Sequence, residues 1–169
     1  MGNQQVTDAD LGWLAGVVDG EGSIAIQRCH HNTPSGRRGY YSARCQVVNT
    51  DPGIIAAVLN MLACLDVGHY VTESARAGCR MLITVRVDRF ESIERLLVAI
   101  SPHLRGEKRA RAGLLLRFVR ARMSHGKNVR GNRFLNVPYT VEEAATAEQL
   151  LHGNLNDYTR DLTESVANG

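Results

Sequence analysis

Apolar residues along the first hundred positions recur with two alternating periods, close to 3.6 and close to 2, which indicate helices and strands respectively. Each stretch with the shorter period holds two runs separated by turn residues, which is typical of a hairpin. The predicted elements are a helix from Thr7 to Gly20, a strand pair over Ser23–Cys29 and Tyr40–Asn49, a helix from Pro52 to Leu65, a strand pair over Val67–Glu73 and Cys79–Val87, and a helix from Arg89 to Ile100.

This order of helix, hairpin, helix, hairpin and helix predicts an α+β fold of the form αββαββα, with helices covering one face of a four-stranded antiparallel sheet. Apolar positions between 114 and 119 and a helix start at Thr140 predict further helices, the last of them over 154–166. A chain of 169 residues suits one domain. We expect a single domain over 1–169, with a core at about 7–124 and a C-terminal helical extension at about 138–166.

Alternation assigns one face of each strand to the core. The expected core side consists of Tyr41, Ala43, Cys45 and Val47 in one strand and Met81, Ile83 and Val85 in another. The opposite face carries hydrogen-bonding side chains, namely Gln27, Tyr40, Ser42, Arg44, Gln46, Arg80, Thr84 and Arg86. Arginine pairs with guanine and glutamine with adenine in the major groove of DNA, which admits a β-ribbon. This face is therefore a candidate DNA-reading surface, although antiparallel sheets also turn polar faces to water.

Positive charge gathers in one part of the chain, although the net charge is only +3. Between Leu104 and Arg133, Glu107 is the only acidic residue. The basic residues of this stretch are Arg105, Lys108, Arg109, Arg111, Arg117, Arg120, Arg122, Lys127, Arg130 and Arg133. Because opposite charges are nearly absent from a stretch that also has a buried helix face, we expect contacts with phosphate groups.

The composition restricts the cellular setting. The 4 cysteines are widely spaced and form no metal-binding pair, which favours a reduced protein. No apolar run reaches the roughly 20 residues that span a bilayer, and the amino terminus does not have the layout of a signal peptide. We expect an intracellular protein with no membrane partner, in the cytoplasm of a prokaryote or the stroma or matrix of an organelle, and not secreted.

The first predicted helix has an unusual distribution of glycine. Gly12, Gly16 and Gly20 recur every four residues on one side, although glycine in a helix costs about 1 kcal/mol relative to alanine. Such a bare face lets a second backbone approach closely. Glu21 follows between two glycines at the end of the helix, a position where a carboxylate can bind a metal ion.

The nine residues Leu14–Gly22 (Leu-Ala-Gly-Val-Val-Asp-Gly-Glu-Gly) resemble the motif that names the LAGLIDADG homing endonucleases. The motif occurs once, as in the single-motif, homodimeric branch of that family. The resemblance implies a site-specific endonuclease that hydrolyses double-stranded DNA at a long pseudo-palindromic target, with two or three Mg²⁺ ions per dimer active site. It leaves open a catalytically inactive DNA- or RNA-binding module, a maturase or regulator, and intron RNA as a further partner.

The resemblance also implies roles for particular residues. Glu21, Asn49 and Lys108 correspond to catalytic positions, and Glu21 and Gly20 to metal-binding positions. Arg105 or Arg109 could substitute for Lys108, because the spacing before it is one residue long. The expected dimer interface consists of Leu11, Gly12, Ala15 and Gly16. The expected DNA contacts are Ala25, Gln27, Arg37, Arg38, Tyr40, Ser42, Arg44, Gln46, Arg80, Leu82, Thr84, Arg86, Arg105 and Arg109.

Two further assignments concern an active-site arginine of the family and the motif residue Asp19. An active-site arginine of the family has no counterpart among Pro52, Gly53 and Ile54. Asp19 lies two residues before Glu21, and side chains two apart do not share a helix face. We therefore expect Asp19 to stabilise the end of the helix and not to bind the metal.

Overall fold

The computed structural model describes residues 6–33, 36–75, 77–126 and 137–153, except for the side chains of His31, Thr33, Arg37 and Arg38. The predicted α+β fold is confirmed, whereas the helix expected over 154–166 lies outside these ranges. The elements are α1 (Asp8–Glu21), β1 (Gly22–Thr33), β2 (Gly36–Asn49), α2 (Pro52–Cys64), β3 (Tyr70–Ser74), β4 (Leu82–Val87), α3 (Phe90–Ile100), α4 (Gly106–Ser124) and α5 (Val141–His152).

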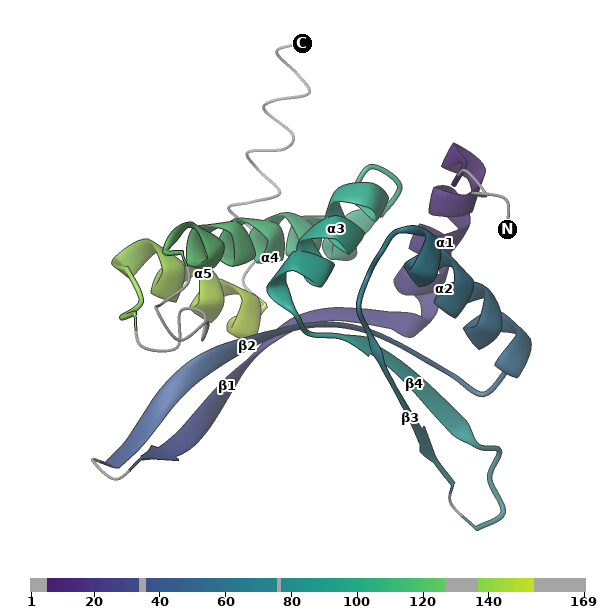
Figure 1. Ribbon diagram of the computed structural model, residues 1–169, viewed down its shortest axis with the longest axis horizontal. Helices are drawn as coiled ribbons and strands as arrows, with labels where there is room; N and C mark the ends of the chain where they lie inside the picture. Colours follow the sequence, from purple (N-terminus) through teal and green to yellow (C-terminus); the bar gives the residue numbers. More distant parts are fainter. Residues whose placement is uncertain (1–5, 34–35, 76, 127–136, 154–169) are drawn as a thin grey trace.

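The four strands form an antiparallel sheet in the order β1-β2-β4-β3. Figure 1 shows the sheet as an arch that carries all the labelled helices on its convex side and leaves its concave side open. β1 pairs with β2 along its whole length, from Gly22 opposite Val47 to Thr33 opposite Gly36. β2 pairs with β4 only over Cys45–Asn49. Residues 25–33 and 36–44 therefore project beyond the sheet as a two-stranded extension, which we call the ribbon.

The first helix passes directly into the first strand. Thr7 caps α1 through a reciprocal capping box with Asp10, as expected for its sequence. At the other end, a side chain at Gly22 would place its Cβ 2.7 Å from the carbonyl oxygen of Val18. Only glycine fits this position. With glycine there, α1 continues directly into β1 without an intervening loop, and Glu21 lies at the junction.

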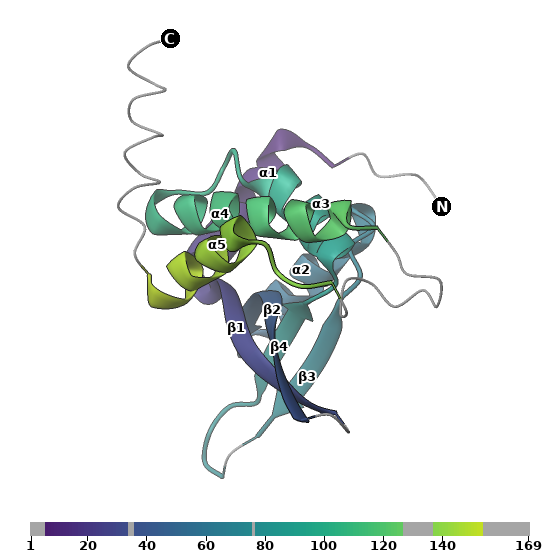
Figure 2. The same cartoon turned by 90° about the vertical axis from the view of Figure 1, so that its left-hand side faces the viewer.

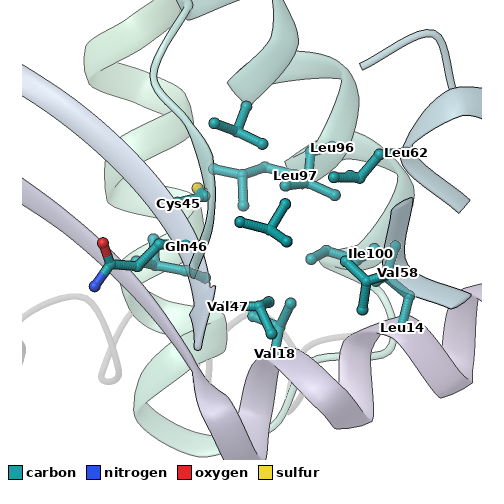
Figure 3. A pocket seen from close by; sticks show the side chains of 13 residues that line it. Leu14, Val18, Cys45, Gln46, Val47, Val58, Leu62, Leu96, Leu97 and Ile100 are labelled. Atoms are coloured by element: carbon teal, nitrogen blue, oxygen red, sulfur yellow. The ribbon is translucent and has the colours of Figure 1, made fainter. Parts of the chain in front are cut away.

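The core lies between the sheet and the helices. Figure 3 shows Leu14 and Val18 of α1 facing Val47 of β2 and Val58 of α2 around a cavity of about 20 Å³, room for roughly one water molecule. Gln46 points away from this cavity. The alternation predicted for β2 is thus confirmed between Ser42 and Val47. Ala43, Cys45 and Val47 are buried in the core, whereas Ser42, Arg44 and Gln46 are half-buried and lie on the open face.

Two expectations about the second hairpin are wrong. Met81 was expected in the core, but β4 begins only at Leu82 and the Met81 side chain is 47% exposed. Val67 was expected to begin a strand, but it closes α2 instead. Asp66 adopts a left-handed conformation (φ 52°), and the Val67 N–H donates to the Leu62 carbonyl at 2.8 Å. This helix ending buries Val67, and β3 starts three residues later.

A buried ion pair fixes the C-terminal segment to the core. The Arg122 guanidinium donates to the Glu143 carboxylate at 3.0 Å, and the two side chains are only 3% and 2% exposed. Arg122 also lies 4.3 Å from the centre of the Tyr139 ring. Burial alone would raise the pKa of Glu143, but hydrogen bonds from the Thr140 N–H, His125 and Arg122 outweigh it and lower that pKa.

The expectation of phosphate contact is therefore wrong for Arg122 in the basic stretch. Its neighbours on α4 also have protein partners: Arg120 donates to Glu94 at 2.7 Å, and Arg111 donates to the Leu150 carbonyl at 3.2 Å. Glu107 is the only acid of the stretch itself, but other elements supply Glu94 and Glu143. Lys127, Arg130 and Arg133 lie outside the described residues.

No helix within the described ranges is both long enough and apolar enough to cross a bilayer.

Candidate active site and DNA interface

The motif carboxylate stands at the end of α1, next to the sheet. Glu21 is the last residue of α1 and its side chain is exposed. Within the described part of the chain, its carboxylate makes no hydrogen bond or ion pair. A hard oxygen ligand is therefore free at the point where helix and sheet meet, as a magnesium site requires.

Lys108 comes from α4 to the same end of α1. Its Nζ donates to the carbonyl oxygens of Val18, at 2.7 Å, and Asp19. The last carbonyls of a helix lack partners and carry partial negative charge. The last turn of α1 has no basic residue of its own, so Lys108 supplies the missing positive charge. The two motif-related residues with opposite charge, Glu21 and Lys108, are thereby brought to one helix end.

Asp19 makes the reciprocal link from α1 to α4. Its Oδ2 accepts from the backbone N–H of Arg105 at 3.1 Å, at the start of α4. Arg105 caps α4 without a side-chain hydrogen bond, so Asp19 provides the negative charge that favours a helix N-terminus. This bond differs from the role expected for Asp19, because it acts at the start of α4 and not at the end of its own helix. The Asp19 Oδ1 is buried and has no hydrogen-bond partner among the described residues, whereas Glu21 is the exposed carboxylate of the motif.

Asn49 ends β2, and its side-chain oxygen is already engaged. Oδ1 accepts from the Asp51 N–H at 2.8 Å, just before α2 begins. The side-chain amide nitrogen and the second lone pair of Oδ1 remain for another partner. Asn49 could therefore contribute a donor or an acceptor to the site.

The glycine side of α1 is open in the protomer. Gly16 and Gly20 are exposed, and a Cβ added at either would meet no atom within 4 Å. Gly12 and Leu11 are half-buried, and Gly12 faces His103. Ala15 differs from the other residues expected at the interface, because it is fully buried in the core of its own protomer. Packing among the described residues thus gives no reason for glycine at positions 16 and 20.

Trp13 joins this exposed side of α1, and the sequence reasoning missed it. It is the only tryptophan of the chain, and its side chain is 40% exposed. Gly16 and Gly20 follow it at three and seven residues, the spacing that places residues on one helix face. That spacing was the available signal.

The open face of the sheet collects most of the predicted DNA contacts. One row crosses all the strands, because Ser23 lies opposite Gln46, Gln46 opposite Arg86, and Arg86 opposite Tyr70. The rest of the face consists of Ala25 opposite Arg44, Gln27 opposite Ser42, Cys29 opposite Tyr40, Val48 opposite Thr84, Thr84 opposite Thr72, and Leu82 opposite Ser74. None of these residues is acidic, so the face suits a polyanion.

Arg44 and Arg86 lie at the centre of the open face, and contacts with the protein do not neutralise their positive charge completely. The Nε of Arg86 lies 3.2 Å from an Asp88 carboxylate oxygen, and its guanidinium carbon lies 5.8 Å from the centre of the Tyr70 ring. The buried Nε of Arg44 has no hydrogen-bond partner among the described residues. A ligand on this face could satisfy it.

The remaining predicted DNA contacts lie elsewhere. Arg80 is exposed in the segment before β4, and Arg105 is exposed at the start of α4. Arg109 lines a hollow between α3 and α4, on the helical side of the molecule. Arg37 and Arg38 lie in the backbone of β2, but their side chains are outside the described set.

The donors present in one protomer fit only part of a divalent-metal site. Among the described residues, no three histidine, cysteine, aspartate or glutamate side chains gather in one place. Glu21 is a suitable oxygen ligand, and backbone oxygens such as that of Gly20 are also hard ligands. One carboxylate per protomer would leave most coordination positions to water, to DNA or to a second protomer.

Comparisons with known proteins identify the fold. No family model and no curated protein matches this sequence. Among solved structures, the homing endonuclease I-CvuI gives a TM-score of 0.58 at 19% identity, covering 92% of this chain and 95% of that one. The homing endonuclease I-TnaI gives 0.57 at 17% identity, covering 91% and 96%. The archaeal intron-encoded homing endonuclease I-Vdi141I, solved with DNA, gives 0.56 at 15% identity, covering 89% and 84%.

These likenesses cover nearly the whole length of the I-CvuI and I-TnaI chains, so the fold is that of a homing endonuclease. Together with the motif at Leu14–Gly22, they confirm that the chain has the LAGLIDADG homing-endonuclease fold.

Proposed function

We propose that this protein is a site-specific, metal-dependent DNA endonuclease that acts as a homodimer. The observation that carries the proposal is the convergence of Glu21 and Lys108 at the end of α1. A free carboxylate and an ammonium group there border an open, acid-free sheet face that fits the DNA backbone and grooves. The fold of I-CvuI and I-Vdi141I, both solved with DNA, agrees with this assignment.

Glu21, with the Gly20 carbonyl, would hold Mg²⁺ in this proposal. Bound there, Mg²⁺ would supply activation of a water nucleophile and stabilisation of charge on the leaving oxygen. I-CvuI has been solved with Mg and with Ca, which supports a divalent ion. Lys108 would hold positive charge beside the reacting phosphate, and the Asn49 amide nitrogen would orient a water molecule. The proposal extends to two or three ions per dimer active site.

A second protomer would supply the second carboxylate. Gly16 and Gly20 present a bare helix surface for which the protomer itself provides no packing partner. Two α1 helices packed across these glycines would place both Glu21 side chains near a twofold axis. Twofold symmetry of the protein then implies a pseudo-palindromic target. Such targets in intron-containing genes would make the activity one of intron homing.

Substitution of Glu21 tests the chemistry. Glu21→Gln keeps the size of the side chain but removes the charge that binds the metal, so DNA binding should persist while magnesium-dependent cleavage is lost. Cleavage of a randomised DNA library by the unmodified chain would first define the target. Glu107→Gln, an exposed acid on α4, is the matched control and should cleave normally. Sequence-specific binding without cleavage by the unmodified chain would favour the inactive binding module instead.

The dimer can be tested independently of cleavage. Gly16→Leu should sediment as a monomer because a branched side chain separates the two helices, whereas Ala56→Leu, at an exposed position on α2, should not change the sedimentation. Trp13 is the only tryptophan, so its fluorescence should shift to the blue as protein concentration rises. A monomeric unmodified chain, or an unchanged Gly16→Leu dimer, would refute this interface.

A further inference from the structure

The ribbon stands largely without support from the sheet. Toward its tip from Arg44, β2 has β1 as its only strand neighbour, since the pairing with β4 covers Cys45–Asn49 alone. An isolated two-stranded hairpin is marginally stable in water. Yet Gln27, Tyr40 and Ser42, which face the open side, belong to this part of the chain. Accurate reading of bases by the ribbon requires something else to hold it.

α5, in the C-terminal segment, contacts the ribbon on the side opposite the open face, at one pair of facing residues. Arg28 and Tyr41 lie opposite each other in the β1–β2 pairing. The Glu148 carboxylate of α5 accepts hydrogen bonds from both the Arg28 guanidinium and the Tyr41 hydroxyl. Figure 2 shows α5 beside the upper part of β1. One carboxylate thus ties both strands of the ribbon to the helical layer.

The two hydrogen bonds to Glu148 contribute unequally to fixing the ribbon. The Arg28 side chain is 55% exposed, so its ion pair with Glu148 contributes little on its own. The Tyr41 hydroxyl is partly buried, and its hydrogen bond to Glu148 is shielded better from water. Hydrogen bonds from Tyr41 and Arg28 lower the pKa of Glu148, so the carboxylate is ionised at neutral pH.

Tyr139 covers the edge of β2 where β4 no longer pairs. The backbone N–H of Tyr41 donates to the Tyr139 hydroxyl at 2.9 Å, in place of the carbonyl that a neighbouring strand would offer. The two rings meet edge to face with centres 5.0 Å apart. Tyr139 also stacks on Phe118 of α4, which is fully buried. The edge of the ribbon is therefore connected to the core through one aromatic side chain.

We propose that Glu148 and Tyr139 are positioning residues that set how the ribbon meets DNA and so determine base discrimination beneath it. This inference rests on the proposed function. In a pleated strand, alternate residues face opposite sides, so holding Arg28 and Tyr41 from behind fixes the adjacent Gln27 and Ser42 in front. The C-terminal segment thereby takes part in specificity without touching DNA.

The test uses the full chain and two variants, one at each of the two positioning residues. Glu148→Gln weakens the tie to both strands, and Tyr139→Phe deletes only the hydroxyl that accepts from the edge of β2. Glu142→Gln, an exposed acid on the same helix, is the control for the change in charge. For each protein, cleavage rates on the selected target are measured with every single base-pair substitution, together with amide hydrogen exchange of the ribbon without DNA.

Both variants should lose about fivefold in discrimination at the base pairs under the ribbon, the factor expected for one lost hydrogen bond. Discrimination under Gln46 and Arg86, where β2 pairs with β4, and the maximal cleavage rate at saturating protein should be unchanged. Ribbon amides should exchange about fivefold faster, with α1 amides unchanged. In a double variant, Tyr41→Phe should add less to Glu148→Gln than it costs alone, because Glu148→Gln has already weakened the hydrogen bond that Tyr41→Phe removes.

Three outcomes would overturn the inference: an unchanged discrimination profile, an equal loss at every base pair, or unchanged exchange of the ribbon amides. A uniform loss would indicate a merely structural role for the segment. If the unmodified chain selects no target at all, the proposed function fails, while the exchange experiment still decides whether Glu148 and Tyr139 hold the ribbon.

Discussion

Glu143→Gln is expected to destabilise the protein strongly, because it removes the carboxylate charge that faces the buried Arg122 guanidinium. The substitution retains an oxygen that can accept from the Thr140 N–H, so the helix cap is kept. Arg122 also donates to the carbonyl oxygens of Val137, at 3.1 Å, and Pro138, at 3.4 Å, and these bonds can persist. Both acceptors are neutral, so they do not replace the lost ion-pair attraction.

The magnitude follows from the burial of the pair. Both side chains are at most 3% exposed, and breaking a buried ion pair from one side costs about 3–5 kcal/mol. This is a large part of the roughly 5–15 kcal/mol by which domains are stable. The exposed neighbour Glu142 offers the matched control, and Glu142→Gln should change the free energy of unfolding by less than about 0.5 kcal/mol.

Urea unfolding followed by circular dichroism measures the effect. The double variant Arg122→Met with Glu143→Gln should be more stable than Glu143→Gln alone, since it removes the buried guanidinium charge together with the carboxylate charge. A Glu143→Gln protein within about 1 kcal/mol of the unmodified chain would contradict the reasoning. So would a double variant less stable than the single one.

Three further effects are expected. Burial raises and hydrogen bonds lower the pKa of Glu143, and the net effect is a lowering. The stabilising contribution of Glu143 is therefore complete above the ordinary carboxyl pKa of about 4.3 and is lost as pH falls through the lower pKa of the folded state. Acid unfolding should be less steep for Glu143→Gln. Gly22→Ala should cost about 1–3 kcal/mol in a thermal melt because its Cβ would overlap the preceding helix turn, whereas Gly20→Ala, which meets no neighbour, should not destabilise the monomer. Cys45, whose pKa burial raises to about 12, should resist a thiol reagent in the native protein while exposed Cys64 reacts, and equal labelling of both would contradict the structure.

The elements set by local pattern could be predicted from the sequence. Thr7 and Asp10 cap α1 as their spacing indicates, and the period of 2 placed Cys45 and Val47 in the core. Met81 was placed wrongly because alternation shows which side a residue faces but not where a strand begins. Val67 was placed wrongly because the left-handed turn before it involves aspartate, which signals such a turn less clearly than glycine.

The site could be predicted where the motif is contiguous, but not where distant elements meet. Glu21 and Asp19 follow from nine consecutive residues. The approach of Lys108 to α1 was implied by resemblance alone, since 90 residues separate it from Val18. Arg122 was misassigned to phosphate because a scan of neighbouring residues cannot see Glu143, an acid 21 positions later that folds back onto it.

The reciprocal links between α1 and α4 have a consequence for the order in which the molecule is made. Asp19 and Lys108 join segments 86 to 90 residues apart, so the motif precedes its ammonium partner by about half of the chain. A nascent or truncated chain that stops before α4 displays Glu21 without Lys108. Under the proposed function, such a chain would not cut DNA, and activity would begin only after the ribosome has synthesised α4.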